Sequence, residues 1–169
     1  NLHIVLSEPM LSRIVKDYRT ETGGVAECIL GAWVTGCQTT DTSVRADIKP
    51  SHNTGMFQLI VDGHTVSNTQ GRKKPATIFT RGNHRFHIVK PTYFDGESLS
   101  SGKATMDVNA YNQTVGVSTD YDKIPIIRGI ARKIAASEAA KKQGQSEAIA
   151  ARKLANRALP RFESEVGQK

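Results

Sequence analysis

A change in the period of the hydrophobic pattern, near Pro125, restricts the fold of this chain more than any other feature. Between Val25 and Thr119, apolar and polar residues alternate with a period of two, as in strands that bury one face. Beyond Pro125, apolar residues recur with a period of 3.6, as in amphipathic helices. We therefore expect an α+β protein in which an antiparallel meander of about five to seven strands packs against helices.

The alternation is clearest in residues 42–49 and 104–111, where small or apolar residues alternate with polar ones. Half-buried antiparallel strands show this pattern because one face meets the core and the other meets water. The expected apolar face of the sheet consists of Val44, Ala46, Ile48, Phe57, Leu59, Val61, Met106 and Val108.

Two Asp-Gly pairs that follow apolar runs, Asp62-Gly63 and Asp95-Gly96, predict hairpin turns. The central positions of such turns need a positive φ, which these residues adopt readily. Residues 67–75 form the longest expected loop, and it carries Arg72, Lys73 and Lys74.

Helices are expected at both ends of the sheet segment. Ser7 is a candidate N-cap for a short helix that ends at Gly23-Gly24, while residues 2–6 alternate too briefly for a prediction. After Pro125, Gly144 and Ser146 suggest an end and a new start, and Pro160 suggests a kink or an early end. These signals predict a C-terminal helical pair or one long kinked helix. At about 100–200 residues per domain, residues 1–122 (helix and sheet) and 123–169 (basic, Ala-rich helices) form one packed domain.

The net charge of +7 is concentrated near the C-terminus. Residues 1–122 contain 12 basic and 12 acidic residues, whereas residues 123–161 contain 10 basic residues against Glu138 and Glu147. This asymmetry favours contact with an anionic polymer or lipid headgroup, although a solvated helix face explains it as well. The candidate contact residues are Arg128, Arg132, Lys133, Lys153, Arg157 and Arg161.

Other partners are constrained by what the sequence lacks. Phe162 is the single aromatic residue after Tyr121, so the basic helices offer no platform for base stacking, and sequence-specific nucleic-acid binding is not expected. No apolar run approaches the roughly 18 residues of a transmembrane helix. A protein partner or a homo-oligomer stays open.

No catalytic or cofactor motif is present. The nearest approach to a nucleophile elbow, residues 96–100, lacks the final Gly, and no phosphate-binding Gly-rich loop occurs. His84 and His87 have odd spacing, which on a strand places the rings on opposite faces and argues against a shared metal ion. We therefore expect no enzymatic activity, no cofactor and no metal.

The two cysteines, Cys28 and Cys37, are expected to be free thiols. If they share one strand, they lie about 30 Å apart and on opposite faces, beyond the reach of a disulfide. A bridge would need a turn among residues 32–34, the most apolar part of the segment. We expect both thiols to be buried or half-buried.

Several short runs resemble a family of uncharacterised, exported bacterial proteins. They are residues 28–32, 38–40, 93–96, 112–114, 146–150 and 159–162. The resemblance implies an exported, periplasmic or secreted location and carries no assigned chemistry. The order of helix, meander and long helix is also similar to tubular lipid-binding domains, in which a curved sheet wraps a helix.

Three functions follow as hypotheses. The first is a non-enzymatic binding or scaffolding module of the bacterial envelope, which should expose an apolar patch or a strand edge. The second is a carrier of an apolar or lipid-like ligand between sheet and helix, which needs a cavity of about 300 Å³ or more. The third is a hydrolase with an unrecognised site, which needs polar groups with perturbed pKa values converging in one cleft.

Overall fold

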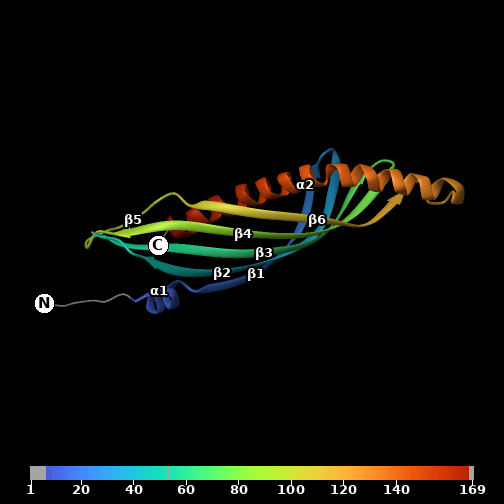
Figure 1. Ribbon diagram of the computed structural model, residues 1–169. Coiled ribbons are helices and arrows are strands. Elements are labelled where there is room, and N and C mark those ends of the chain that lie inside the picture. Colours follow the sequence, from blue (N-terminus) through green and yellow to red (C-terminus); the bar gives the residue numbers. More distant parts are fainter. Residues whose placement is uncertain (1–6, 53, 168–169) are drawn as a thin grey trace.

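The structure is a computed structural model that describes residues 7–52 and 54–167 (Figure 1). It confirms the predicted α+β class, with an antiparallel sheet of six strands, a short N-terminal helix and a long C-terminal helix. The elements in chain order are α1 (Glu8–Val15), β1 (Asp17–Ile29), β2 (Ala32–Lys49), β3 (Gly55–Lys73), β4 (Ala76–Phe94), β5 (Leu99–Ser101), β6 (Thr105–Thr119) and α2 (Pro125–Gly167).

The sheet is a meander of long strands that curves around α2. Neighbours pair in the order β1, β2, β3 and β4, and both β5 and β6 pair with β4. The β1–β2 and β3–β4 hairpins rise beside α2, and the first half of α2 projects past them (Figure 1). We call the face of the sheet turned toward α2 the inner face and the opposite one the outer face.

The core lies between the inner face and the second half of α2. Val61, Phe86 and Ile88 are buried there, and Leu154, Ala158, Leu159 and Phe162 of α2 pack against them. Of the predicted apolar face, Val44, Met106 and Val108 pack against the same cluster, and Ala46 is buried. Burial of these side chains, at about 25 cal/mol per Å² of apolar surface, holds the helix in the curve of the sheet.

The C-terminal segment is one long helix of 43 residues, as the second of the two predicted alternatives has it, and the helical pair with a break at Gly144 and Ser146 is wrong. A glycine in a helix interior costs only about 1 kcal/mol. Glu147 lies one turn beyond Gly144 and accepts a hydrogen bond from the backbone N–H of Asn112, which ties the helix to β6 at that point. Pro160 also lies inside the helix, which continues to Gly167.

Two of the predicted turns are strands instead. Residues 67–73 belong to β3, and the β3–β4 turn is made by Lys74 and Pro75. Asp62 and Gly63 lie in the middle of β3, where Gly63 pairs with Phe86 of β4. A Cβ on Gly63 would come within 1.9 Å of the Phe86 ζ carbon, so glycine is required for the aromatic ring to cross the strand.

Positive φ angles occur in two of the hairpin connections, one that was not predicted and one that was. Leu30 and Gly31 connect β1 and β2 with φ values of 52° and 75°, a pair of positive angles typical of a type I′ turn. Asp95-Gly96 connects β4 and β5 as predicted, with Gly96 at φ 105°. Asp95 accepts hydrogen bonds from the backbone of Glu97 and Ser98, which lowers the pKa of its carboxyl group.

The N-terminal helix is shorter than predicted. Ser7 is its N-cap and accepts a hydrogen bond from the N–H of Met10, but the helix ends at Val15 and Gly23-Gly24 lies in β1. Beyond Val44, β2 has no partner in β1, and α1 covers this edge. Ser12 donates to the carbonyl of Ala46, which satisfies one of the exposed backbone groups. Residues 2–6, for which the sequence supports no prediction, lie outside the described residues.

The cysteines lie on two adjacent strands, so the single-strand arrangement is wrong. Cys28 pairs with Trp33, and Cys37 pairs with Gly24 of β1. Both are free and exposed rather than buried. Four residues of strand, about 13 Å, separate their pairing positions, which keeps the two sulfur atoms beyond bonding distance.

Candidate ligand cavity

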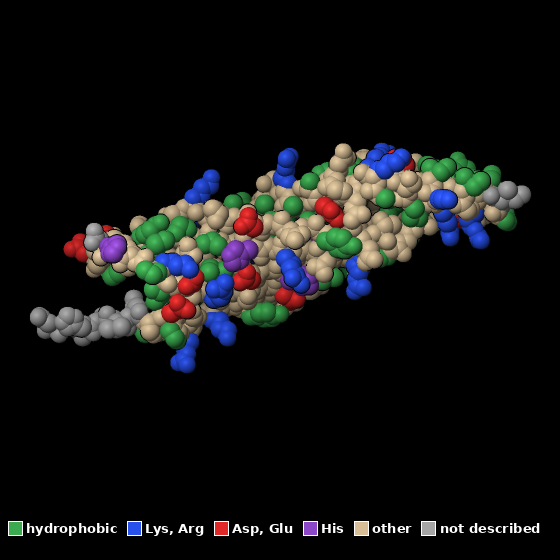
Figure 2. All heavy atoms as spheres, viewed as in Figure 1, with side chains coloured by type: hydrophobic (Ala, Val, Ile, Leu, Met, Phe, Trp, Pro, Cys, Tyr) green, Lys and Arg blue, Asp and Glu red, His purple; other side chains and the backbone are tan. Residues whose placement is uncertain are grey.

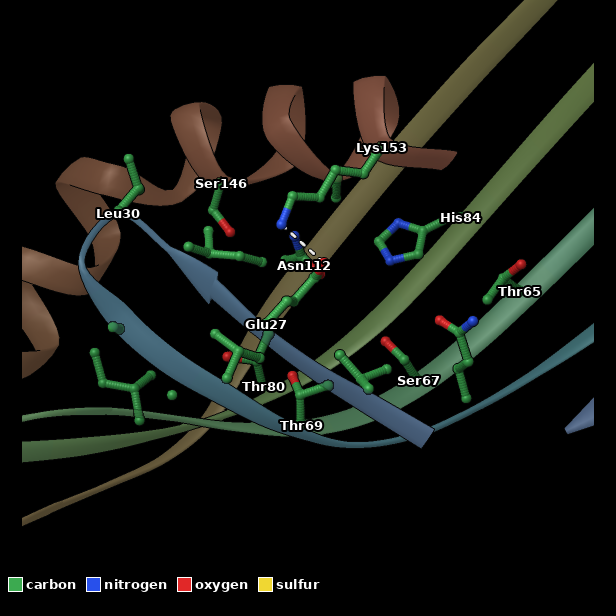
Figure 3. Close-up of a pocket in the computed structure, with 18 of the residues that line it drawn as sticks. Glu27, Leu30, Thr65, Ser67, Thr69, Thr80, His84, Asn112, Ser146 and Lys153 are labelled. Atoms are coloured by element: carbon green, nitrogen blue, oxygen red, sulfur yellow. Dashed lines mark hydrogen bonds and ion pairs between the residues drawn. The ribbon is translucent and has the colours of Figure 1, made fainter. Parts of the chain in front are cut away.

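The inner face of the sheet and α2 enclose a cavity of about 930 Å³ (Figure 3). Its volume lies at the upper end of the range of about 300–1,000 Å³ typical of small-molecule sites. Ile130 and Ile134 line it from the projecting half of α2, yet they are 63% and 60% exposed. Side chains of the core therefore close one end of the cavity. The other end, beside the first half of α2, is open.

The pairing register divides the inner face into three bands. The deep band is the packed core, with Val44, Val61, Phe86 and Ile88. The outer band is the part of the inner face nearest to the β1–β2 and β3–β4 hairpins. It contains Ile29, Ala32, Val34 and Ile78. Between them lies a polar belt of Thr65, Ser67, Thr69, Thr80, His84 and Asn112. Strand alternation turns every one of these side chains toward α2.

Three polar atoms of the belt converge above Gly82, the residue that Ser67 and Asn112 flank on adjacent strands. A Cβ on Gly82 would lie 2.4 Å from Ser67 Oγ, 2.6 Å from His84 Nε2 and 3.1 Å from Asn112 Oδ1. The absence of a side chain at this position lets the three groups meet. The belt therefore has both hydrogen-bond donors and acceptors within reach of one small polar group.

His84 is the titratable group of the belt. Burial lowers its pKa below the ordinary value because the charged ring would lose hydration, so the imidazole is neutral at pH 7. Its Nδ1 atom is buried and has no hydrogen-bond partner among the described residues. On the other side of the belt, Thr65 is 2% exposed and its hydroxyl shares a 2.8 Å hydrogen bond with Thr40.

Two carboxylates of α2 bind backbone N–H groups of β6 and of the residue just before it. Glu147 accepts from the Asn112 N–H at 2.8 Å, and Glu163 accepts from the Ala104 N–H at 2.8 Å. Glu163 also pairs with Lys90, which is only 5% exposed. The hydrogen bond from Lys90 lowers the pKa of Glu163, so the carboxylate is ionised at neutral pH.

The opposite side of the helix meets β1 through ion pairs. Lys153 and Arg157 both contact Glu27, at 2.8 and 3.1 Å, and Arg161 forms two hydrogen bonds with Glu21. The hydrogen bonds from Arg161 lower the pKa of Glu21. In Figure 3, Lys153 reaches from α2 across the cavity to Glu27. We call this set of pairs the β1 seam.

Four of the six candidate anion-contact residues are thus paired within the chain. Lys153, Arg157 and Arg161 belong to the β1 seam, and Arg132 pairs with Asp122 at 2.7 Å. The ion pairs of the described residues do not include Arg128 or Lys133. Figure 2 shows Lys and Arg side chains beside apolar ones over the projecting end of α2. Contact with an anionic polymer or lipid headgroup stays a prediction for these six residues.

The two central histidines lie on opposite faces of β4. His84 faces the cavity, whereas His87 lies at a second hollow on the outer face, where its Nδ1 atom is 2.7 Å from Asp62. No group of three metal-ligating side chains occurs among residues 7–52 and 54–167.

Sequence reasoning missed the polar belt and Gly82. The signal was present as small polar residues at the inward positions 65, 67, 69, 80, 112 and 114, between stretches whose inward residues are apolar. Without the pairing register of the strands, these residues are indistinguishable from the polar residues of any half-exposed strand.

Comparisons with family models, curated proteins and solved structures gave no match to this chain. The resemblance to exported bacterial proteins therefore stays an expectation. In the described part of the chain, no helix combines the length and hydropathy that a membrane span requires.

Proposed function

We propose that this chain is a non-enzymatic binding module that carries an apolar or lipid-like ligand between its curved sheet and α2. The observation that supports this most is the 930 Å³ cavity, whose outer band faces isoleucines that the chain itself leaves uncovered. A ligand that covered the exposed surface of these isoleucines would gain about 1–2 kcal/mol of binding free energy from each of Ile127, Ile130 and Ile134. A location in the bacterial envelope belongs to the same proposal and rests on the resemblance alone.

The projecting isoleucines also favour a second candidate, a scaffold that docks another protein chain. An exposed apolar patch beside basic residues is a feature of interaction surfaces. The two candidates differ in what covers Ile130 and Ile134: a small molecule inside the cavity, or a chain laid over the helix.

Binding of an apolar fluorescent probe, N-phenyl-1-naphthylamine, to the purified chain tests the first candidate. Ala135 lines the cavity, whereas the adjacent Ala136 is exposed on α2 outside it. We expect Ala135→Trp to fill the outer band and weaken probe binding at least tenfold, and the matched control Ala136→Trp to leave it unchanged.

Two outcomes would contradict this proposal. Equal probe binding by Ala135→Trp and Ala136→Trp would place the probe outside the cavity. A wild-type chain that binds no probe and is dimeric by native mass spectrometry would support the scaffold instead.

A further inference from the structure

The polar belt determines which kind of ligand the cavity suits. A wholly apolar ligand that reached the belt would leave the Ser67 hydroxyl and the His84 ring without partners, at about 1–3 kcal/mol for each buried group. The inward side chains of the outer band, Ile29, Ala32, Val34 and Ile78, in contrast, match an alkyl chain. Only an amphipathic molecule matches both regions at once.

We propose that the polar belt binds the uncharged, hydroxyl-bearing head of a single-chain amphipathic ligand whose alkyl chain lies along the outer band. A monoacylglycerol represents this chemical class. The inference rests on the proposed function, since it assigns a ligand class to the same cavity.

The convergence above Gly82 supports a small head group with hydroxyls. Ser67 Oγ donates and accepts, Asn112 Oδ1 accepts, and a neutral imidazole has one donor and one acceptor nitrogen. All three groups lie within 3.1 Å of the Cβ position of Gly82. A hydroxyl that lies above Gly82, farther from the strand than this position, finds both kinds of partner, and the unpartnered Nδ1 atom of His84 is in the same belt.

The charges around the belt favour an uncharged head over a carboxylate or phosphate. Glu147 accepts a hydrogen bond at 2.8 Å from the N–H of Asn112, a residue of the belt, so a carboxylate already lies beside the belt. Lys153, the cation that reaches across the cavity, is paired with Glu27 at 2.8 Å. An anionic head at the belt would therefore meet a neutral ring and the Glu147 carboxylate, while Lys153 and Arg157 are held by Glu27.

The arrangement of the bands sets the direction of the ligand. The deep band is filled by Phe86, Ile88 and Phe162, so no chain extends past the belt in that direction. From Ser67 to Lys73, at the hairpin end of β3, the strand rises about 20 Å at 3.3 Å per residue. This distance accommodates one long alkyl chain that leaves the belt toward Ile130 and Ile134.

The test compares one apolar probe with three ligands of equal chain length. N-phenyl-1-naphthylamine reports occupation of the outer band, and a monoacylglycerol, the matching fatty acid and the matching alkyltrimethylammonium ion compete with it. We expect the monoacylglycerol to displace the probe at a concentration at least tenfold lower than either charged ligand. Tighter displacement by the fatty acid or by the ammonium ion would overturn the proposal.

Variants of the belt complete the test. Gly82→Ala places a methyl group among Ser67, His84 and Asn112, whereas Gly23→Ala, in the same cross-strand row, meets no atom within 4 Å. We expect Gly82→Ala to weaken monoacylglycerol binding about tenfold or more, with probe binding within about twofold of wild type, and Gly23→Ala to change neither.

If Gly82→Ala does not fold, Ser67→Ala takes its place, because it removes one belt hydroxyl without adding volume. The two proposals fail in different ways. Absence of probe binding by the wild-type chain would remove the proposed function. Normal probe binding with monoacylglycerol affinity unaffected by Ser67→Ala and Gly82→Ala would remove only the role of the polar belt.

Discussion

Gly63 shows how one missing side chain shapes the core. It lies in the middle of β3 opposite Phe86, which is 7% exposed, and a Cβ there would overlap the ring at 1.9 Å. The ring covers the glycine backbone and so excludes water from a strand position that has no side chain of its own. This arrangement resembles the aromatic rescue of strand glycines used in designed sheets.

We expect Gly63→Ala to destabilise the fold by about 1–3 kcal/mol, because the added methyl group displaces Phe86 from its packed position. Gly24→Ala is the matched control, since a Cβ in β1 at that position meets only a backbone oxygen 4.0 Å away. Urea denaturation of both variants measures the difference. Equal midpoints for the two would show that Phe86 does not depend on Gly63.

The surroundings of Gly63 also show why the sequence alone predicted a turn at this position. Asp62-Gly63 is a strong local signal for a hairpin, and nothing within its neighbourhood contradicts it. What decides its conformation is Phe86, 23 residues further along, and the register that brings the two together is a property of the whole sheet. The polar belt escaped prediction for the same reason, because Ser67, His84 and Asn112 come from three strands.

At the scale of elements, α2 depends on its few acidic residues. Its periodicity was visible in the sequence, but Glu147 and Glu163 looked like minor exceptions in a basic segment. In the structure they accept hydrogen bonds from the backbone N–H groups of Asn112 in β6 and of Ala104, just before β6, and fix the helix along the sheet. Two such anchors, on either side of Leu154, explain why Gly144 and Pro160 do not divide the helix into a pair.

We expect Glu163→Gln to destabilise the chain at pH 7 by about 1–3 kcal/mol, because Lys90 would stay buried without its counter-ion. This destabilisation is smaller than the loss expected for a fully buried ion pair, since the Glu163 side chain is 35% exposed. The pKa of Glu163 is lower in the folded chain than its ordinary value of 4.5. The contribution of the ionised carboxylate to the free energy of unfolding is therefore present above that value and is lost as the pH falls through the folded-state pKa. Glu163→Gln should remove this part of the acid sensitivity.

Glu138→Gln is the control for that measurement. Glu138 pairs with Lys141 on an exposed part of α2, and pairs of this kind contribute little. Thermal melts between pH 3 and about 7 compare the two variants with wild type. An unchanged midpoint for Glu163→Gln at pH 7, or the same acid sensitivity as wild type, would contradict the anchoring role.

At the scale of the whole molecule, the two long sides of α2 are held differently. Toward β6 the helix packs closely and the Glu147 carboxylate bonds to the strand backbone, whereas toward β1 it is held by the ion pairs of the β1 seam. Arg157 and Arg161 are more than half exposed, so salt reaches these pairs. Apart from the open end at Ile130 and Ile134, we therefore expect the β1 seam to be the side on which the helix separates from the sheet most easily.

We expect the apolar probe to leave the cavity several times faster as salt rises from about 0.1 to 1 M, where the Debye length falls from about 10 to 3 Å. Glu27→Gln should speed release at low salt and flatten the salt dependence, because Lys153 and Arg157 share that carboxylate. Glu97→Gln, in the β4–β5 turn, serves as the control and should behave like wild type. Stopped-flow transfer of the probe to excess neutral vesicles gives the rates. Rates that do not change with salt in the wild-type chain would mean that the ligand leaves through the open end beneath Ile130 and Ile134, with the β1 seam closed throughout.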